Sequence, residues 1–214
     1  MLQHTSGLPD YLEMMIVNWR PELDDDNPEK YISGNIDIII MLEVKEPEVL
    51  FEPKEKWAYS NTGYVLLATI VERASGKPFE EFLRERIFEP VGMQNTNVYS
   101  YVTGKDQKMP MCVFGFTPKD GKFTSNDTHF LNFAKGDGGI NSTLEDLWKW
   151  DRILYTDKLV SEETIKTIFS PAKLNNCETT DYGYGWFIED TPLGNKLYAM
   201  VAVGSVLEPT SIEA

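Results

Sequence analysis

The sequence predicts an α+β protein, in which a mostly helical lobe precedes part of an antiparallel sheet with flanking helices. Residues 61–75 and 78–89 are consecutive segments whose apolar side chains share one helical face. Residues 183–206 instead form two strand-like stretches joined by a turn with Pro192 and Gly194, which indicates a β-hairpin. Helices and antiparallel strands in separate stretches of one chain are typical of the α+β class.

Glycine and proline delimit the two central helices. Gly76 follows the first helix at a position where a left-handed backbone commonly ends a helix. Pro78 begins the second helix, where its missing N–H group does no harm. We expect this second helix to stop before Pro90 and Gly92.

Serine residues predict the start of two further helices. Ser142 is the expected N-cap of the first of them, and the side chain of Glu145 in its first turn can reach back to Ser142. The residues expected on the core face of this helix are Leu144, Leu147, Trp148 and Leu154. Ser161 is the expected N-cap of the next helix, whose first turn is acidic and therefore matches the positive end of the helix dipole.

The remaining segments give weaker signals. Residues 10–19 suit a short helix, and the acidic, proline-containing residues 20–35 suit a solvated surface segment. Residues 36–50 fit a helix and a strand equally well. In a stretch rich in glycine and threonine, residues 112–116 and 121–125 are the best candidates for strands or loops.

The composition argues against several classes of function. The chain has 34 acidic and 20 basic residues and a formal charge of −14, whereas a nucleic-acid-binding protein needs a basic surface. His4 and His129 are too few for a zinc-hydrolase site, and we expect neither a metal nor a cofactor. Cys112 and Cys177 match no metal-binding spacing and are interpreted as unpaired small hydrophobes. No apolar run reaches the roughly 18 residues of a membrane span.

Three polar residues, Tyr59, Ser60 and Asn61, lie at the start of the helix at 61–75. A tyrosine oxygen acts as a general base only when a neighbouring ammonium lowers its pKa from about 10. The amide of Asn61 could hold a lysine and donate to a substrate carbonyl. The simpler alternative is that Ser60 or Asn61 caps the helix while Tyr59 packs.

Four segments, in this order, resemble the serine β-lactamase-related family, which comprises class C β-lactamases, DD-peptidases and related esterases. They are "HTSGLPDY" at 4–11, the dense stretch at 51–96, "GDGGINSTLEDLWKW" at 136–150 and "YGYGWF" at 182–187. The resemblance extends to about Leu197. Several separate motifs in the same order make it specific.

The resemblance implies a β-lactamase/transpeptidase-like fold of two lobes with an acyl-serine site between them. Tyr59 and Asn61 would be the catalytic motif residues, while Ser60, Gly138 and Gly139 would contribute to substrate binding. The reaction implied is acyl transfer or hydrolysis of a β-lactam, a D-alanyl peptide or a small ester through an acyl-serine. A periplasmic or extracellular location is implied as well.

The sequence departs from the family pattern at two motifs. The family's S-x-x-K nucleophile precedes the "HTSGLP" segment, at which this sequence starts. One S-x-x-K, Ser170 to Lys173, follows the tyrosine motif and contains Pro171, so we interpret it as a coincidence. The K-T-G or H-x-G strand, which the resemblance predicts after "GNKLY" at 194–198, is also missing, because the sequence there continues as "AMVAVGSVLEPTSIEA". The Val-Thr-Gly at 102–104 lacks the leading base and lies too early.

These departures predict a single incomplete domain, with residues 1–140 forming mainly a helical and loop lobe and residues 141–214 forming helices and the hairpin. We expect this chain to be inactive, marginally stable and prone to associate through an open sheet edge. Two alternatives remain: a non-catalytic module that binds a peptide or a partner, and a structural domain without a site.

Overall fold

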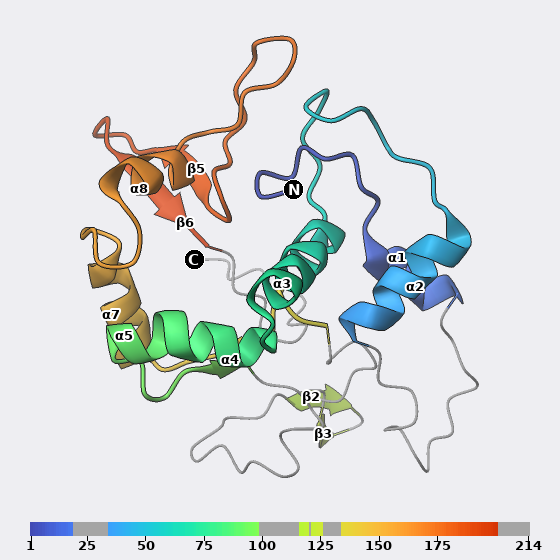
Figure 1. Cartoon of the computed structure of the whole chain (residues 1–214), viewed down its shortest axis with the longest axis horizontal. Helices are drawn as coiled ribbons and strands as arrows, with labels where there is room; N and C mark the ends of the chain where they lie inside the picture. Colours follow the sequence, from blue (N-terminus) through green and yellow to red (C-terminus); the bar gives the residue numbers. More distant parts are fainter. Residues whose placement is uncertain (19–33, 99–115, 120, 126–133, 201–214) are drawn as a thin grey trace.

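The computed structural model describes residues 1–18, 34–98, 116–119, 121–125 and 134–200 (Figure 1). The helices are α1 (Tyr11–Asn18), α2 (Asn35–Lys45), α3 (Asn61–Ser75), α4 (Phe79–Leu83), the π-helical turn η2 (Arg84–Phe88), α5 (Glu89–Val91), α7 (Leu144–Ile153) and α8 (Glu162–Ile168). The strands are β1 (Asn97–Val98), β2 (Phe116–Lys119), β3 (Lys122–Ser125), β4 (Ile140–Asn141), β5 (Phe187–Asp190) and β6 (Lys196–Ala199). In the described part of the chain, no helix is both long and apolar enough to cross a membrane.

Helix α3 occupies the middle of the molecule, with α1 and α2 on one side and α8, β5 and β6 on the other (Figure 1). It begins after Ser60, whose backbone is extended, and ends at Gly76, whose φ of 69° is left-handed. The N–H group of Gly76 donates to the carbonyl of Glu72 at 2.9 Å and closes the last turn. The predicted helix and its glycine end are thus confirmed.

Two apolar clusters form the core, one beside α3 and one beside the helix that follows it. The first cluster joins α1, α2 and α3 to the segment before β4: Tyr11, Met15, Ile38, Met41, Val65 and Ala134. The second lies between α4, α5 and α7: Leu83, Phe88 and Met93, with Trp150 packed against them. Each large apolar side chain removed from water contributes about 1.5–3 kcal/mol to folding.

The helix after Pro78 extends further than the sequence predicts. It continues through α4, η2 and α5 to Val91, past Pro90, and ends at Gly92 with a φ of 80°. The π turn η2 ends two residues before Pro90, and the N–H group of Met93 reaches back five residues, to the carbonyl of Phe88. A widened turn relieves the clash that a proline ring makes with the preceding turn of a regular α-helix.

Helix α7 starts one residue later than the sequence predicts. Its N-cap is Thr143, whose side-chain oxygen accepts the N–H group of Asp146 at 3.2 Å. The Ser142 hydroxyl, predicted as the cap, instead lies 2.7 Å from the hydroxyl of Thr96. Both residues are hydroxyl-bearing cap formers, so the local sequence does not choose between them.

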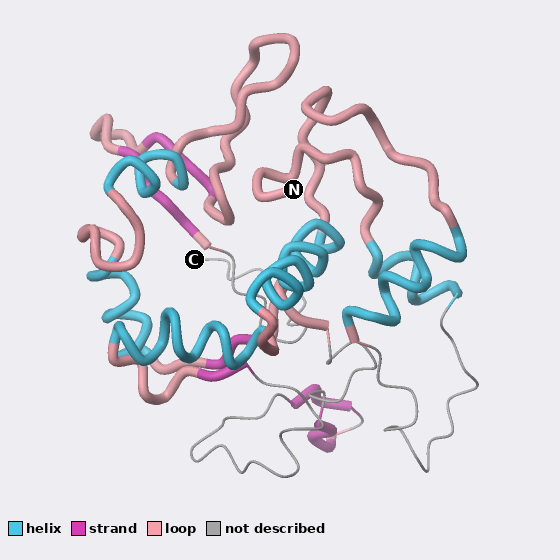
Figure 2. Tube along the Cα trace, in the orientation of Figure 1, coloured by secondary structure: helices cyan, strands magenta, loops and turns pink. Residues whose placement is uncertain are grey.

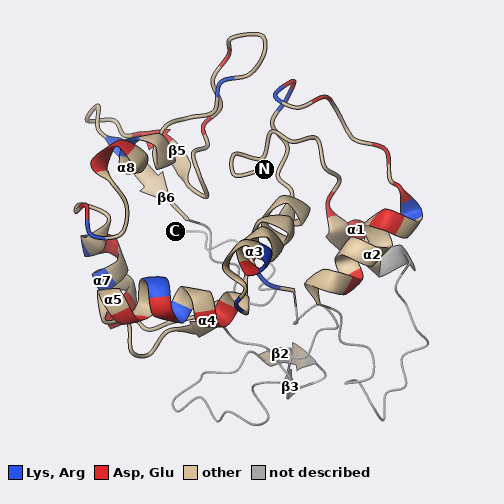
Figure 3. Ribbon diagram, in the orientation of Figure 1, with Lys and Arg blue, Asp and Glu red and all other residues tan. Residues whose placement is uncertain are grey.

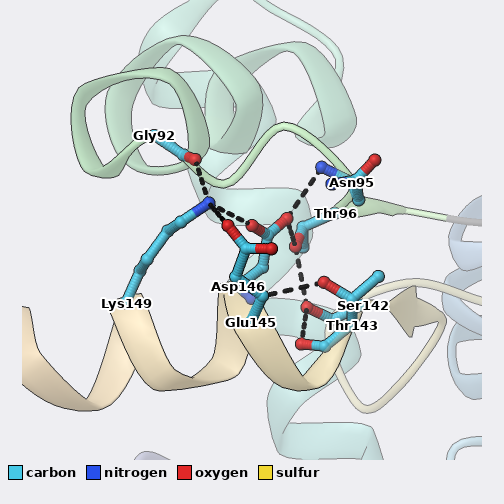
Figure 4. Close-up of polar contacts among 8 residues, drawn as sticks. All are labelled: Gly92, Asn95, Thr96, Ser142, Thr143, Glu145, Asp146 and Lys149. Carbon is cyan, nitrogen blue, oxygen red and sulfur yellow. Dashed lines mark hydrogen bonds and ion pairs between the residues drawn. The ribbon is translucent and has the colours of Figure 1, made fainter.

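A buried carboxylate holds α7 against the chain after α5, and we call this group the α7 anchor (Figure 4). Asp146 is fully buried and accepts hydrogen bonds from the Asn95 N–H group (2.7 Å), the Thr96 hydroxyl (3.0 Å) and the Lys149 ammonium (2.8 Å). Lys149 also donates to the carbonyl of Gly92 at 2.9 Å. Burial opposes ionisation of Asp146, but these hydrogen bonds outweigh it and lower its pKa.

The face of α7 that packs is not the one predicted. Leu144, Leu147 and Trp148 are 87%, 43% and 63% exposed, while Leu154 is half-buried at the end of the helix. The covered face instead carries Asp146 and Trp150, which packs on the second cluster. A buried carboxylate with three hydrogen bonds therefore sets the orientation of this helix more strongly than its leucines do.

The sheet part is small, because the described strands form three two-stranded antiparallel pairs. Figure 2 draws the strands as magenta stretches of the tube. Strands β5 and β6 confirm the predicted C-terminal hairpin, with Phe187 opposite Ala199 and Asp190 opposite Lys196. Helix α8 before it is capped by Ser161, as predicted, through the N–H group of Thr164 at 3.2 Å.

Three weaker predictions are also resolved. The predicted helix at 10–19 contains α1, and the undecided segment 36–50 forms α2 followed by a loop. The candidate strand at 121–125 forms β3, which pairs with β2. The candidate at 112–116, apart from Phe116, and most of the predicted surface segment lie outside the described residues.

Figure 3 shows acidic and basic residues interspersed along α4, α5, α7 and α8.

Candidate functional site

The N-termini of α1 and α3 meet at Asp10. Its Oδ1 accepts the N–H group of the second residue of α1 at 2.9 Å, and its Oδ2 accepts the N–H group of Asn61 at 2.9 Å. The Thr62 hydroxyl completes the junction, since it accepts from the N–H group of Tyr11 at 2.8 Å and donates to the carbonyl of Pro9 at 2.7 Å. The two helices satisfy each other's free N–H groups.

We call Tyr59, Ser60 and Asn61 the α3 mouth. Asn61 directs its amide at Asp10, because Nδ2 donates to Oδ2 of Asp10 at 2.8 Å. This bond fixes which end of the amide is the donor, and it turns the carbonyl oxygen away from Asp10. One N–H of the Asn61 amide is therefore used within the protein, and the donation of the other to a substrate carbonyl stays a prediction.

Tyr59 lies half exposed (49%) over the ring of His4, with a ring centroid distance of 4.2 Å. Its pKa is raised, first by burial and then by the negative charges of Asp137 and Asp10. A general base needs the opposite shift. In this environment the phenol of Tyr59 stays protonated at neutral pH.

Asp137 comes from the loop before β4 and faces α1. The hydroxyl of Tyr11 donates to its Oδ2 at 2.6 Å. Burial is the largest cause of the raised pKa of Asp137, and the neighbouring charge of Asp10 adds to it, although the Tyr11 hydrogen bond acts against it. Burial and the Asp137 charge also raise the pKa of Tyr11 far above its usual range.

The loop around Asp137 touches α3 through its backbone. A Cβ atom added at Gly136 would lie 2.3 Å from the carbonyl oxygen of Tyr64 and 2.6 Å from the Cβ of Ala68, and the φ of Gly136 is 107°. Only glycine fits there. Gly138 and Gly139 follow and are exposed, so their predicted contribution to substrate binding remains a prediction.

Ser60 is buried in the α3 mouth. Its N–H group donates to Nδ1 of His4 at 3.1 Å, and its hydroxyl oxygen has no hydrogen-bond partner among the described residues. The hydroxyl is not turned to solvent, since the residue is 2% exposed. Its predicted role in substrate binding remains a prediction. The simpler cap interpretation is corrected in one respect, because the Ser60 side chain makes no cap hydrogen bond, and Asp10 accepts the N–H group of Asn61.

His4 is the residue of this site that sequence reasoning misses. Considered alone, it is one possible metal ligand with too few partners, but in the structure it is 2% exposed and contacts Tyr59, Ser60 and Tyr182. Burial lowers its pKa to about 4, so the imidazole is neutral at pH 7. The signal that points to it is its place in the "HTSG" segment. No group of metal-ligating side chains occurs in the described part of the chain.

The Ser170 to Lys173 segment is not organised as a nucleophile site. The Ser170 hydroxyl donates to the backbone carbonyl of Lys166 at 2.6 Å, and the residue is exposed at the end of α8. Lys173 is exposed and lies in a backbone bridge to Thr179. These contacts support the interpretation of this motif as a coincidence.

The other singled-out residues have simple outcomes. Cys177 is unpaired, as predicted, and its side chain is exposed. Cys112, His129 and the Val-Thr-Gly at 102–104 lie outside the described residues.

The fold and the α3 mouth together define the class of the protein. The chain belongs to the Beta-lactamase family, whose profile matches residues 1–206. The resemblance and the fold class inferred from the sequence are confirmed.

Three similar proteins place the chain within the family. A penicillin-binding protein of Bacillus subtilis (strain 168) is 38% identical over 201 residues, which cover 90% of this chain and 43% of that protein. The crystal structure of a penicillin-binding protein from Bacillus halodurans is 26% identical with a TM-score of 0.71, over 90% of this chain and 56% of that one. A D-amino acid amidase from Ochrobactrum anthropi, complexed with L-phenylalanine amide, is 27% identical with a TM-score of 0.65, over 92% and 54%. The chain thus spans about half the length of these proteins.

Proposed function

We propose that the protein takes part in acyl transfer through an acyl-serine and that its α3 mouth forms one wall of the site. The substrate would be a D-alanyl peptide, a β-lactam, or a small ester or amide. The observation that carries the proposal is the arrangement of Tyr59 and Asn61, which residues of the "HTSGLPDY" segment hold at a helix N-terminus. Similarity to penicillin-binding proteins and to a D-amino acid amidase supports the substrate class.

In such a reaction the phenolate of Tyr59 would take the proton of the attacking serine. An ammonium beside the phenol would be needed, because it stabilises the phenolate and lowers the pKa from about 10. The charges that act on Tyr59 here are the carboxylates of Asp137 and Asp10, and they raise its pKa. We therefore expect the chain by itself to bind substrate without turning it over.

The second candidate is a non-catalytic binding module, and the same observation favours it. A protonated Tyr59 is a hydrogen-bond donor, and Asn61 turns its carbonyl oxygen away from Asp10 as an acceptor. A donor and an acceptor two residues apart suit a peptide backbone.

Rapid mixing of the chain with a chromogenic cephalosporin and with a nitrophenyl ester tests turnover. We expect no burst of product. A burst would overturn the predicted inactivity, and its loss in Ser170→Ala would assign the nucleophile to Ser170.

Calorimetric titration with a D-alanyl-D-alanine peptide tests the site itself. We expect weak saturable binding that Tyr59→Phe and Asn61→Ala each reduce about fivefold to tenfold, because each loses a hydrogen bond. Tyr155→Phe is the matched control, since Tyr155 is an exposed tyrosine on the chain just after α7. Absence of binding, or equal effects of Tyr59→Phe and Tyr155→Phe, would favour the remaining alternative, a structural domain without a site.

A further inference from the structure

His4 is held inside the protein by an unusual backbone turn. Its φ is 52°, in the left-handed region that residues other than glycine seldom occupy. Its N–H group donates to the carbonyl of Met1 at 3.0 Å, and its own carbonyl accepts the N–H group of Ala58 at 2.9 Å. The turn places the imidazole against the segment that leads into α3.

The hydrogen bonds of the ring have a defined direction. Nδ1 accepts the N–H group of Ser60 at 3.1 Å, so the neutral ring carries its proton on Nε2. Nε2 lies 3.2 Å from the hydroxyl of Tyr182, which therefore receives this proton in a hydrogen bond. Tyr64, whose pKa is raised by burial and by the neighbouring Tyr182, donates its hydroxyl to the carbonyl of Leu2 at 2.8 Å. Every polar atom of the imidazole is thus used.

The faces and edges of the ring are also occupied. Tyr59 lies tilted over it at 4.2 Å, and the rings of Tyr182, Tyr64 and Trp57 follow at 4.8, 5.2 and 6.0 Å. Of these contacts, the one with Tyr59 is the closest. The other three rings surround the imidazole and fix its position.

We propose that His4 is a positioning residue for the α3 mouth, which fixes the backbone of Ser60 through Nδ1 and the phenol of Tyr59 through its ring face. Asp10 holds Asn61, and His4 holds the two residues before it. The significance of holding Tyr59 rests on the proposed function, but the two contacts do not. Because Tyr59 is half exposed, His4 is the support that limits where its hydroxyl lies.

Two substitutions of His4 separate the two contacts. His4→Phe keeps an aromatic ring for Tyr59 but removes the acceptor of the Ser60 N–H group. His4→Asn keeps a side-chain acceptor and tolerates a positive φ, but removes the ring. Circular dichroism and a thermal melt establish that each variant is folded.

Nuclear magnetic resonance of protein labelled with ¹⁵N and with ¹³C in the tyrosine rings provides the readout. Tyr59→Phe assigns the Tyr59 signal. We expect hydrogen exchange of the Ser60 amide to accelerate about tenfold in His4→Phe and to return close to wild type in His4→Asn. The ¹³C signal of Tyr59 should move in His4→Asn and much less in His4→Phe. The Phe82 amide, bonded to the Pro78 carbonyl in α4, should not change and serves as control.

Unchanged Ser60 exchange in a folded His4→Phe would overturn the proposal, as would an unchanged Tyr59 signal in His4→Asn. Where the variants do not fold, the wild-type protein decides. Protonation converts Nδ1 from an acceptor to a donor, so the Ser60 amide and the His4 ring signals must titrate with one common midpoint. Different midpoints would refute the contact. Absence of peptide binding in every variant would reject the proposed function and leave the positioning result intact.

Discussion

Asp146 in the α7 anchor is fully buried, Asp137 beside the α3 mouth is partly buried, and the two carboxylates have different surroundings. Asp146 has the ammonium of Lys149 at 2.8 Å, and its pKa is lowered. Asp137 has the phenol of Tyr11 at 2.6 Å and a second carboxylate, Asp10, nearby, and its pKa is raised. The charge of Asp146 is thus neutralised by the Lys149 ammonium. Asp137 and Asp10, in contrast, place two carboxylates near the N-termini of α1 and α3.

This difference distinguishes a structural contact from a candidate site. The α7 anchor has what a buried charge needs, a paired cation and hydrogen bonds to each oxygen. Asp137 and Asp10 both disfavour the phenolate of Tyr59, so a cation bound nearby would stabilise it. Groups whose pKa values are moved by burial and by like charges are concentrated at functional sites.

The largest expected effect tests the α7 anchor. Asp146→Ala removes a buried acceptor and leaves the ammonium of Lys149 with less compensation, so we expect the free energy of unfolding to fall by about 4 kcal/mol. Urea unfolding measures this change. Asp151→Ala is the control on the same helix, since Asp151 is half exposed and pairs with Arg152, and it should cost below about 0.5 kcal/mol. Similar losses in both variants would contradict the role of Asp146.

The second effect is a pH dependence of stability that originates at His4, next to the α3 mouth. The pKa of His4 is about 4 in the folded protein and 6.5 in the unfolded chain, so between these values only the unfolded chain binds the proton. The contribution of the neutral His4 to the free energy of unfolding is fully present above pH 6.5. It is lost as the pH falls toward 4, and the loss is at most about 3 kcal/mol. Urea unfolding at several pH values measures it. His4→Asn, which cannot titrate, should show a smaller decrease over this range, and an identical pH profile would contradict the assignment.

A smaller effect compares a shared helix cap with a single one. Asp10 accepts N–H groups at the start of both α1 and α3, whereas Ser161 caps α8 alone. We expect Asp10→Ala to lower the free energy of unfolding by about 2 kcal/mol and Ser161→Ala by about 1 kcal/mol. Chemical denaturation of the two variants side by side gives the ratio. If Asp10→Ala costs no more than Ser161→Ala, the junction of the two helices does not depend on Asp10.

The smallest effect on stability concerns the exposed face of α7. Leu144→Gln should change the free energy of unfolding by less than about 0.5 kcal/mol, because the side chain is 87% exposed. Together with Trp148, Leu144 forms part of an apolar surface that favours association. Sedimentation velocity at increasing concentration should therefore show less association for Leu144→Gln than for wild type. A stability loss of more than about 2 kcal/mol would show that this face is covered.

Features encoded by adjacent residues could be predicted from the sequence. The glycine end of α3, the Ser161 cap of α8 and the hairpin of β5 and β6 each depend on a few neighbouring residues. The orientation of α7 could not, because periodicity shows which residues share a face but not which face the rest of the protein covers. The buried Asp146 is accepted there only because the chain near Asn95 supplies its partners.

The candidate site divides in the same way. Tyr59 and Asn61 could be proposed as site residues because they occur in a contiguous motif with family resemblance. Their supports could not, since His4 lies 56 positions before Ser60 and Asp10 lies 51 positions before Asn61. The raised pKa of Tyr59 depends on Asp137, which is more distant still along the chain. Such contacts are set by the tertiary fold and leave no local pattern.

The close approach of Gly136 to α3 has a consequence for the timescale of motion. The loop that carries Asp137 rests on the Tyr64 carbonyl and on Ala68 with no side chain of its own between them. Side-chain rotation, which takes picoseconds to nanoseconds, therefore cannot separate this loop from the helix. Moving this backbone segment away from α3 is instead a loop motion, which takes nanoseconds to microseconds. The backbone at Gly136 therefore stays against α3 while the exposed side chains around it rotate.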